Sequence, residues 1–100
     1  WHTDQLSYFL DKLAAIKEGD RTLLDNSMIL CGSSISDGNS HQPDNLPILL
    51  AGRAGNRITP GRHIHSPGGT PLCNLYVSML ERMGTPVESF GDSNGALDIA

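Results

Sequence analysis

The residues of this chain best suited to chemistry lie in one polar stretch, SSISDGNSHQPDNLPILLAG, from Ser33 to Gly52. Within it Asp37 and His41 are four residues apart, in a segment with glycine and asparagine residues that permit tight turns. A carboxylate oxygen and an imidazole nitrogen are common ligands of zinc and similar divalent ions. We therefore predict that Asp37 and His41 hold a divalent metal ion, zinc or calcium. Three further residues would add oxygen atoms or orient the two ligands: Asn39, Asp44 and Asn45.

The same composition is also typical of an ordinary loop, because Asp, Asn, Ser and Gly are the usual turn-forming residues. An Asp-x-x-x-His pair is by itself a weak signal. Its position favours a site, since the polar stretch lies between two apolar runs that are expected to be strands. Proteins of the α/β class place their sites in loops at the ends of strands. The sequence leaves both interpretations open.

Other polar side chains are weaker candidates. His63 and His65 are two residues apart and would share one face of a strand, where a solvated edge is the preferred interpretation. Asp92 is expected in a turn rather than in a site. No Walker loop, Gly-x-Ser-x-Gly elbow or Cys-x-x-Cys is present, so no catalytic residue is assigned. Three separated arginines are expected to aid solubility rather than to clamp a phosphate or sulfate: Arg53, Arg57 and Arg62.

Two helices are expected to frame this polar stretch. Apolar residues at helical spacing predict the first over about residues 3–18, capped by Thr3 or Asp4 and ended at Gly19. The second begins with Thr70 as its cap and Pro71 at its first position, and it ends at Gly84. After this helix Val87 and Phe90 are expected to pin the chain, which then frays into Ser, Asn and Gly.

The expected strands are SMILCG, residues 27–32, and LPILLAG, residues 46–52. Apolar runs without alternation predict strands covered on both faces, and the pair is either parallel or antiparallel. A small hairpin with Pro60-Gly61 as its turn is expected over residues 57–65. The predicted order is helix-strand-loop-strand-hairpin-helix, a single α/β segment over residues 1–100. So thin a sheet is expected to need more protein around it.

The composition excludes some classes of function. The chain has 100 residues, 38% of them hydrophobic, and a net charge of −4 with its seven Lys and Arg scattered. Nucleic acid is excluded as a partner, because phosphate backbones require clustered positive charge. No apolar run approaches the roughly 20 residues of a membrane span. The chain starts at Trp1 and enters a helix almost at once, so we expect a cut end.

The string LLDNSMILCGSSISDGNSHQPDNLPILLAG, with the later GRHIHSPGGTPLCNLYVSMLERMGTPVESFGDS, resembles the C-terminal part of the bacterial HXXSHH-motif family. The resemblance extends over essentially the whole chain, including LSYFLDKLAAIKEGD. The His-x-x-Ser-His-His motif itself is absent, and NSHQ around His41 does not replace it. In full-length members the motif lies upstream, so the resemblance implies a fragment of a larger protein. Members tend to carry an export signal, which implies a periplasmic or extracellular location.

This family is in turn similar to the alkaline phosphatase and sulfatase superfamily. There a strand ends in a Ser-Asp-His-Gly loop with a later histidine, followed by a second strand and a Pro-Thr segment before a helix. The matching residues here are SDG at 36–38, His41, LPIL at 46–49 and Thr70-Pro71, but Gly38 stands where the adjacent histidine should be. That departure argues against a standard two-metal centre. It leaves Asp37 and His41 as the ligands carried over.

The resemblance implies that the parent protein is a metal-dependent hydrolase of phosphate or sulfate esters. Its partners would be the rest of the parent polypeptide and an anionic ester substrate. The fragment alone is expected to be inactive. The alternative is a non-catalytic binding or structural module of an exported protein, which the altered Ser-Asp-Gly favours. A free-standing small protein is the least favoured interpretation, because the sheet is unfinished.

Overall fold

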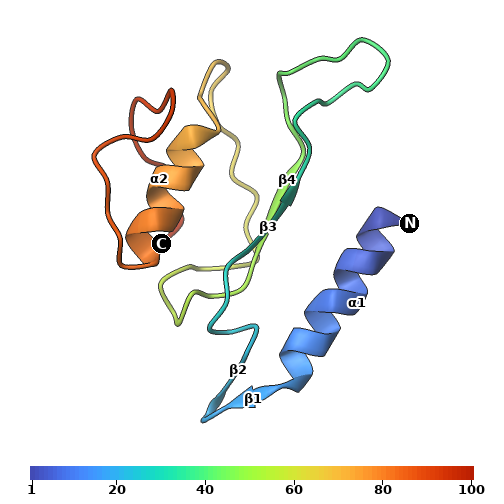
Figure 1. The fold of residues 1–100 in the computed structure, drawn as a ribbon, viewed down its shortest axis with the longest axis vertical. Coiled ribbons are helices and arrows are strands. Elements are labelled where there is room, and N and C mark those ends of the chain that lie inside the picture. Colours follow the sequence, from blue (N-terminus) through green and yellow to red (C-terminus); the bar gives the residue numbers. More distant parts are fainter. The chain divides into compact units, whose positions relative to one another are not determined.

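A computed structural model describes every residue from Trp1 to Ala100. It is a small mixed α/β structure with two helices and two antiparallel hairpins of two strands each (Figure 1). The chain divides into two compact units, residues 1–56 and residues 57–100. The polar stretch between the expected strands belongs to the first unit.

The first unit begins with α1, His2–Ala15, which confirms the predicted first helix. The capping prediction is wrong, because the N-cap is Trp1 and no side chain caps the helix. The helix also ends earlier than expected, since Ile16 is already extended. No residue of α1 is buried, and Phe9 on its apolar face is 46% exposed.

A short hairpin that the sequence did not predict follows α1. It pairs β1, Lys17–Glu18, with β2, Arg21–Thr22. Gly19 has φ 63 and stands first in the two-residue turn, a position that favours glycine in hairpins. The prediction that Gly19 ends the helix is therefore wrong, because its left-handed backbone turns a hairpin instead.

Both apolar runs form strands, as predicted: β3, Ile29–Gly32, and β4, Ile48–Ala51. They pair antiparallel, with Leu30 opposite Leu50 and Cys31 opposite Leu49. The expectation that both faces are covered is not met, since Leu49 is 54% exposed. A pair of strands has no neighbours on either side, and nothing in the unit covers this apolar surface completely.

The base of the β3–β4 hairpin is fixed by close backbone contacts. Gly52 has φ 97, and a Cβ there would collide with the carbonyl oxygen of Ser27. The same oxygen accepts a hydrogen bond from Ala54 N at 3.0 Å. Just before β3, Thr22 and Asp25 bond each other reciprocally between backbone N–H and side chain, at 3.0 and 3.1 Å. The backbone N–H of Thr22 therefore lowers the pKa of Asp25.

The second unit opens without the predicted hairpin. Residues 57–65 contain no strand, although Gly61 has φ 78, as a Pro-Gly turn requires. The backbone N–H of Thr59 donates to Ile99 O at 3.3 Å. The backbone of this segment therefore bonds the end of the chain instead of pairing as a hairpin.

The second helix, α2, spans Cys73–Arg82 and confirms the predicted element. Its predicted cap is wrong, because the hydroxyl of Thr70 donates backward to Pro67 O at 2.7 Å. The predicted end at Gly84 is confirmed by its φ of 82. Gly84 N donates to Glu81 O, and Thr85 N donates to Leu80 O. This pair of bonds is the Schellman pattern that a left-handed glycine permits.

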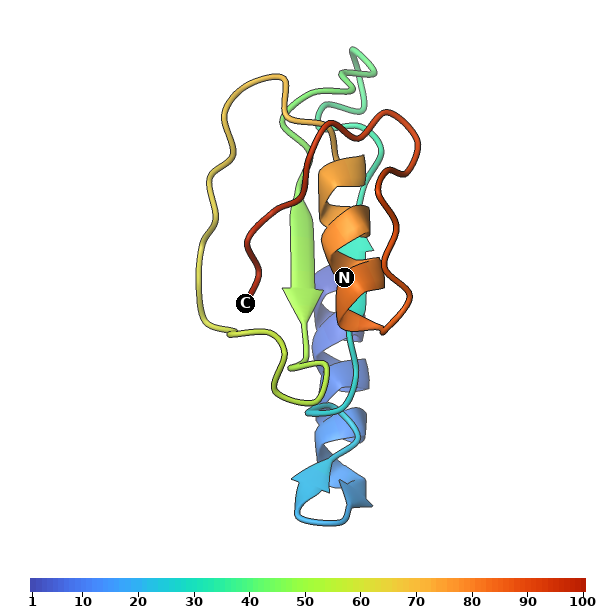
Figure 2. The ribbon, with the colours of Figure 1, turned by 90° about the vertical axis from the view of Figure 1, so that its left-hand side faces the viewer.

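The end of the chain does not fray, contrary to expectation. In Figures 1 and 2 the chain leaves α2 and loops back alongside it. Leu97, near the end of the chain, bonds Ser78 of α2. Ile99 is only 2% exposed, and Ser78 of α2 is 1% exposed. Polar side chains of α2 form hydrogen bonds with the backbone of this segment. The spacing of hydrophobic residues in the sequence does not predict such bonds.

Candidate metal-binding loop

The predicted metal ligands lie in the polar loop, residues 33–47, which joins β3 to β4 and projects beyond their ends (Figure 1). An isolated bridge between Asp37 and Gln42 closes its tip. Ser36 N donates to Gln42 O at 2.8 Å, and Gln42 N donates to Asp37 O at 3.2 Å. The tip is thus a small ordered turn that contains both Asp37 and His41.

The Asp37 carboxylate is oriented by its own loop. Its Oδ1 accepts a hydrogen bond from Asn39 N at 2.9 Å and a longer one from Ser40 N at 3.5 Å. This is the local pattern of an Asx turn. The backbone N–H of Asn39, followed by Ser40, lowers the pKa of Asp37 because both stabilise the charged form. Asp37 is therefore ionised at neutral pH, as a metal ligand must be.

His41 is placed by backbone conformation rather than by a side-chain bond. It has φ 54, in the left-handed region that non-glycine residues rarely adopt. Asn45 has φ 57 and is the second such residue of the loop. Gly38, which the sequence marks as a turning point of the loop, has no positive φ and open space around it. The tight turning thus falls on His41 and Asn45.

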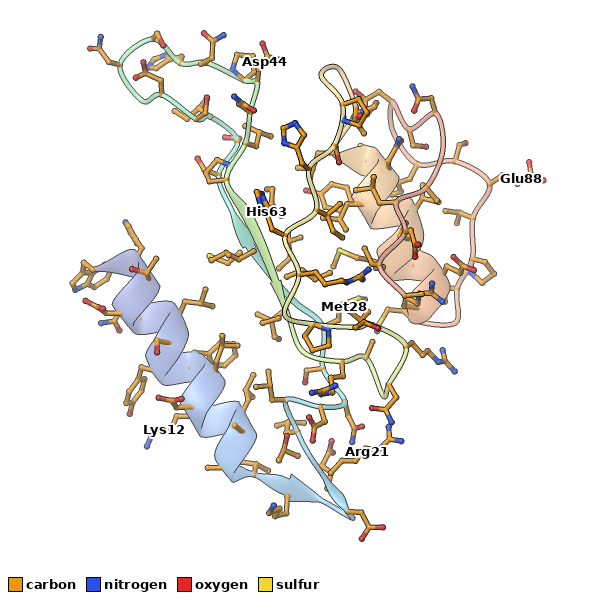
Figure 3. All side chains as sticks on the ribbon, turned by 180° about the vertical axis from the view of Figure 1, so that it is seen from behind. Lys12, Arg21, Met28, Asp44, His63 and Glu88 are labelled. Atoms are coloured by element: carbon orange, nitrogen blue, oxygen red, sulfur yellow. The ribbon has the colours of Figure 1, made fainter.

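Of the residues expected to support the ligands, one bonds Asp37 directly. Asn39 reaches Asp37 through its backbone N–H and not through its side-chain amide. Asp44 lies in the part of the loop beyond the strands and is exposed (Figure 3). These side chains surround the tip without forming a network around Asp37 and His41.

The side chains of the loop are of types that bind a divalent ion, but they are fewer than a complete site requires. Asp37 retains Oδ2 beside the engaged Oδ1, and His41 supplies an imidazole, a combination that zinc accepts. Zinc usually takes three or four protein ligands, whereas no group of three or more His, Cys, Asp or Glu side chains is placed to hold a metal. The polar loop supplies at most part of a metal centre.

The weaker candidates serve local roles. His63 and His65 are exposed on a segment without strand structure, so the prediction that they share one face of a strand is wrong. Figure 3 shows His63 on this segment. Asp92 lies in a turn, as expected, and its side-chain hydrogen bond raises the pKa of the Cys73 thiol. Each arginine has its own partner: Arg53 pairs with Asp25 at 3.6 Å, Arg57 donates to Arg82 O, and Arg62 donates to Thr59 O.

Two polar residues of α2 escaped prediction from the sequence. Asn74 and Ser78 are 5% and 1% exposed, and both bond the returning end of the chain. Their signal in the sequence is a pair of polar residues four apart among the apolar residues of the helix, which places them on one face. The stronger apolar stripe of the same helix masks this signal.

No helix here has the length and apolar character needed to cross a lipid bilayer. Comparison with protein-family models, with curated proteins and with solved structures finds no match to this chain.

Proposed function

We propose that this chain is the C-terminal part of a larger exported protein of the HXXSHH-motif family, with an alkaline-phosphatase-like fold. In this proposal the polar loop supplies part of a divalent metal site, and the parent protein hydrolyses phosphate or sulfate esters in the periplasm or outside the cell. The observation that supports it most is the state of Asp37. Its carboxylate is ionised and oriented at the tip of an ordered hairpin loop.

A divalent ion in such a site polarises an ester oxygen and lowers the pKa of a nucleophile. Asp37 would bind the ion through Oδ2, while the bonds to Oδ1 fix the carboxylate plane. His41 would add its imidazole, which favours zinc over calcium because calcium prefers oxygen ligands. The remaining ligands and the nucleophile would come from upstream parts of the parent protein.

The exposed apolar surface supports the proposal of a larger protein. In the first unit Tyr8 is 62% exposed and Leu49 is 54% exposed. In the second unit Met83 is 66% exposed, and Phe90 is 49% exposed. In this proposal the rest of the parent polypeptide would cover these apolar side chains.

The test is metal stoichiometry in the full-length parent, measured by elemental analysis after purification. We expect Asp37→Ala and His41→Ala each to lower bound metal, because each removes one ligand. Asp11→Ala, which removes an exposed carboxylate of α1, and His63→Ala, which removes an exposed imidazole of the other unit, are the matched controls and should leave it unchanged. Unchanged stoichiometry in both Asp37 and His41 variants would reject the site.

A second candidate function is a non-catalytic binding or structural module. The observation favouring it is that Asp37 Oδ1 already satisfies the backbone of its own turn. Under this alternative, metal-saturated parent protein hydrolyses no member of a broad panel of phosphate and sulfate esters. Asp37→Asn would then disturb only the local turn.

The fragment proposal has its own test. The buried apolar residues number four, Ile58, Leu75, Val77 and Ile99, which is a small core for a chain of this length. We expect the isolated chain to lose structure gradually on heating, as followed by circular dichroism. A sharp cooperative transition of a monomer would contradict the fragment proposal.

A further inference from the structure

The returning end of the chain makes unusual contacts with α2. We name residues 92–100 the C-terminal strap. Asn74 Nδ2 donates to Asn94 Oδ1 at 2.9 Å, and Asn74 Oδ1 accepts from Asn94 N at 2.9 Å. Ser78 Oγ accepts from Leu97 N at 2.8 Å and lies 2.6 Å from Leu97 O. Two helix side chains therefore satisfy polar groups of two strap residues.

The contacts of Ser78 point toward the strap rather than toward its own helix. Its hydroxyl has a single proton, and Leu97 O at 2.6 Å is closer than Asn74 O at 3.2 Å. Hydroxyls inside helices commonly bond the carbonyl four residues earlier. Here the shorter bond goes to the strap, so the hydroxyl holds both polar groups of Leu97.

The strap is shaped to fit one turn of helix. Asn74 and Ser78 are four residues apart, about 6 Å along the helix axis. Three extended residues, from Asn94 to Leu97, would span about 10 Å. The chain bends at Gly95, which shortens this distance and brings both strap residues into register. Beyond them, Ile99 is buried and Thr59 N bonds its carbonyl oxygen.

The strap is held mainly by polar contacts, with Ile99 as its one buried apolar anchor. Of the strap side chains only Ile99 is fully buried, and most of the others are exposed. Segments with few buried apolar contacts open locally before the rest of a unit unfolds. Apart from Ile99 the strap has few such contacts, whereas the face of α2 beneath it carries hydrogen-bonding side chains that need partners when buried.

We propose that the Asn74–Ser78 face of α2 is a peptide-binding surface that the C-terminal strap occupies and from which it detaches. The ligand is a segment bent at a glycine, with an asparagine just before the bend, a backbone amide and carbonyl three residues after that asparagine, and an aliphatic side chain two residues further on. The occupant is the chain's own strap, and the same segment added in trans binds when the strap is released. This proposal is independent of the metal site.

The test uses the full chain with Leu97→Pro, which removes the N–H that Ser78 accepts while leaving both α2 side chains intact. A fluorescent peptide, DSNGALDIA, corresponds to residues 92–100. We expect the fluorescence anisotropy of the peptide to rise when the Leu97→Pro chain is added, because the peptide binds in place of the strap. The peptide should bind the wild-type chain at least about tenfold more weakly, because the strap already occupies the site. Adding Ser78→Ala to Leu97→Pro should weaken binding by about tenfold. The control is the same peptide carrying Leu97→Pro, which should not bind.

Native-state hydrogen exchange of the wild type gives a further test that requires no variant. The amide N–H groups of Asn94 and Leu97 should exchange at least about tenfold faster than that of Leu80 in α2, because the strap opens first. Exchange at the rate of Leu80 would overturn the proposal. So would a Leu97→Pro chain that does not bind the wild-type peptide.

Discussion

The polar loop of the first unit and the C-terminal strap of the other unit have similar compositions, since both are rich in Asp, Asn, Ser and Gly. Their hydrogen bonds differ in range. In the loop, Asp37 and Ser36 bond partners two to six residues away, all exposed. In the strap, Asn94 and Leu97 bond side chains 20 and 19 residues away, at partly buried positions.

This difference separates two uses of polar residues. A loop that satisfies its own backbone needs nothing else from the chain, so its remaining side-chain atoms are available to a ligand. A strap bonded across many residues contributes to the structure of its unit, because breaking the contact leaves buried groups without partners. Substitutions should therefore have small effects at the tip of the loop and large effects beneath the strap.

The largest effect is expected at Gly52, at the base of the β3–β4 hairpin, and Gly38 at the tip of the loop is its matched control. Gly52→Ala should destabilise the β3–β4 hairpin by about 3 kcal/mol, because φ 97 is strained for alanine and its Cβ meets Ser27 O. Gly38→Ala should change stability by less than about 0.5 kcal/mol, since nothing lies within 4 Å of its Cβ. Hydrogen exchange of the Leu30 and Leu50 amides measures the change in hairpin stability caused by each substitution. Equal effects would mean that the tip is as constrained as the base.

Two serines provide the next comparison. Ser78→Ala should cost about 1–3 kcal/mol in the second unit, because Leu97 N and O both lose their buried partner. Ser36→Ala should cost less than about 0.5 kcal/mol, since its exposed hydroxyl makes only a 3.4 Å contact with Gln42 O. Hydrogen exchange in α2 and in β3 reports the two changes. A neutral Ser78→Ala would show that the strap contributes nothing to α2.

A smaller effect is expected from the pair Asn74 and Asn94. A double-mutant cycle with alanine should give a coupling free energy of about 1 kcal/mol, because the two residues share two hydrogen bonds in a partly buried place. The exposed pair Asn26 and Glu18, joined at 3.1 Å, is the control and should couple by less than about 0.5 kcal/mol. Similar values in both cycles would remove the distinction between local and long-range polar contacts.

The elements that the sequence predicted are those encoded by short-range patterns. The helical spacing of Leu6, Phe9 and Leu10 identifies α1, and Gly84 marks the end of α2 through its left-handed backbone. What the sequence missed depends on partners far along the chain. Thr59 bonds Ile99 instead of forming a hairpin, and no local pattern encodes that contact.

The candidate site was predictable to a similar extent. The sequence placed Asp37 and His41 in one loop between two strands, and the structure has that loop. The orientation of the Asp37 carboxylate could not be predicted from the sequence, because it depends on which backbone N–H groups of the turn point at Oδ1. Any metal ligands contributed by other parts of a parent protein cannot be identified from the sequence of residues 1–100.

The smallest effect concerns the charge of Asp37. Its pKa is lowered below the ordinary value of 3.8, chiefly by the backbone N–H of Asn39. A carboxyl group with a lowered pKa in the folded state stabilises the turn above its unfolded pKa, and this contribution is lost as pH falls through the folded value. The turn at residues 37–42 should therefore stay formed at neutral pH and loosen only in acid. The carboxyl carbon of Asp37, followed by nuclear magnetic resonance, should titrate with a midpoint below 3.8. In Asp37→Asn the Asn39 amide should lose the pH-dependent shift that this carboxylate causes. A midpoint at or above 3.8 would mean that the turn does not hold the carboxylate, and the loop would then lose the feature that distinguishes it as a ligand site.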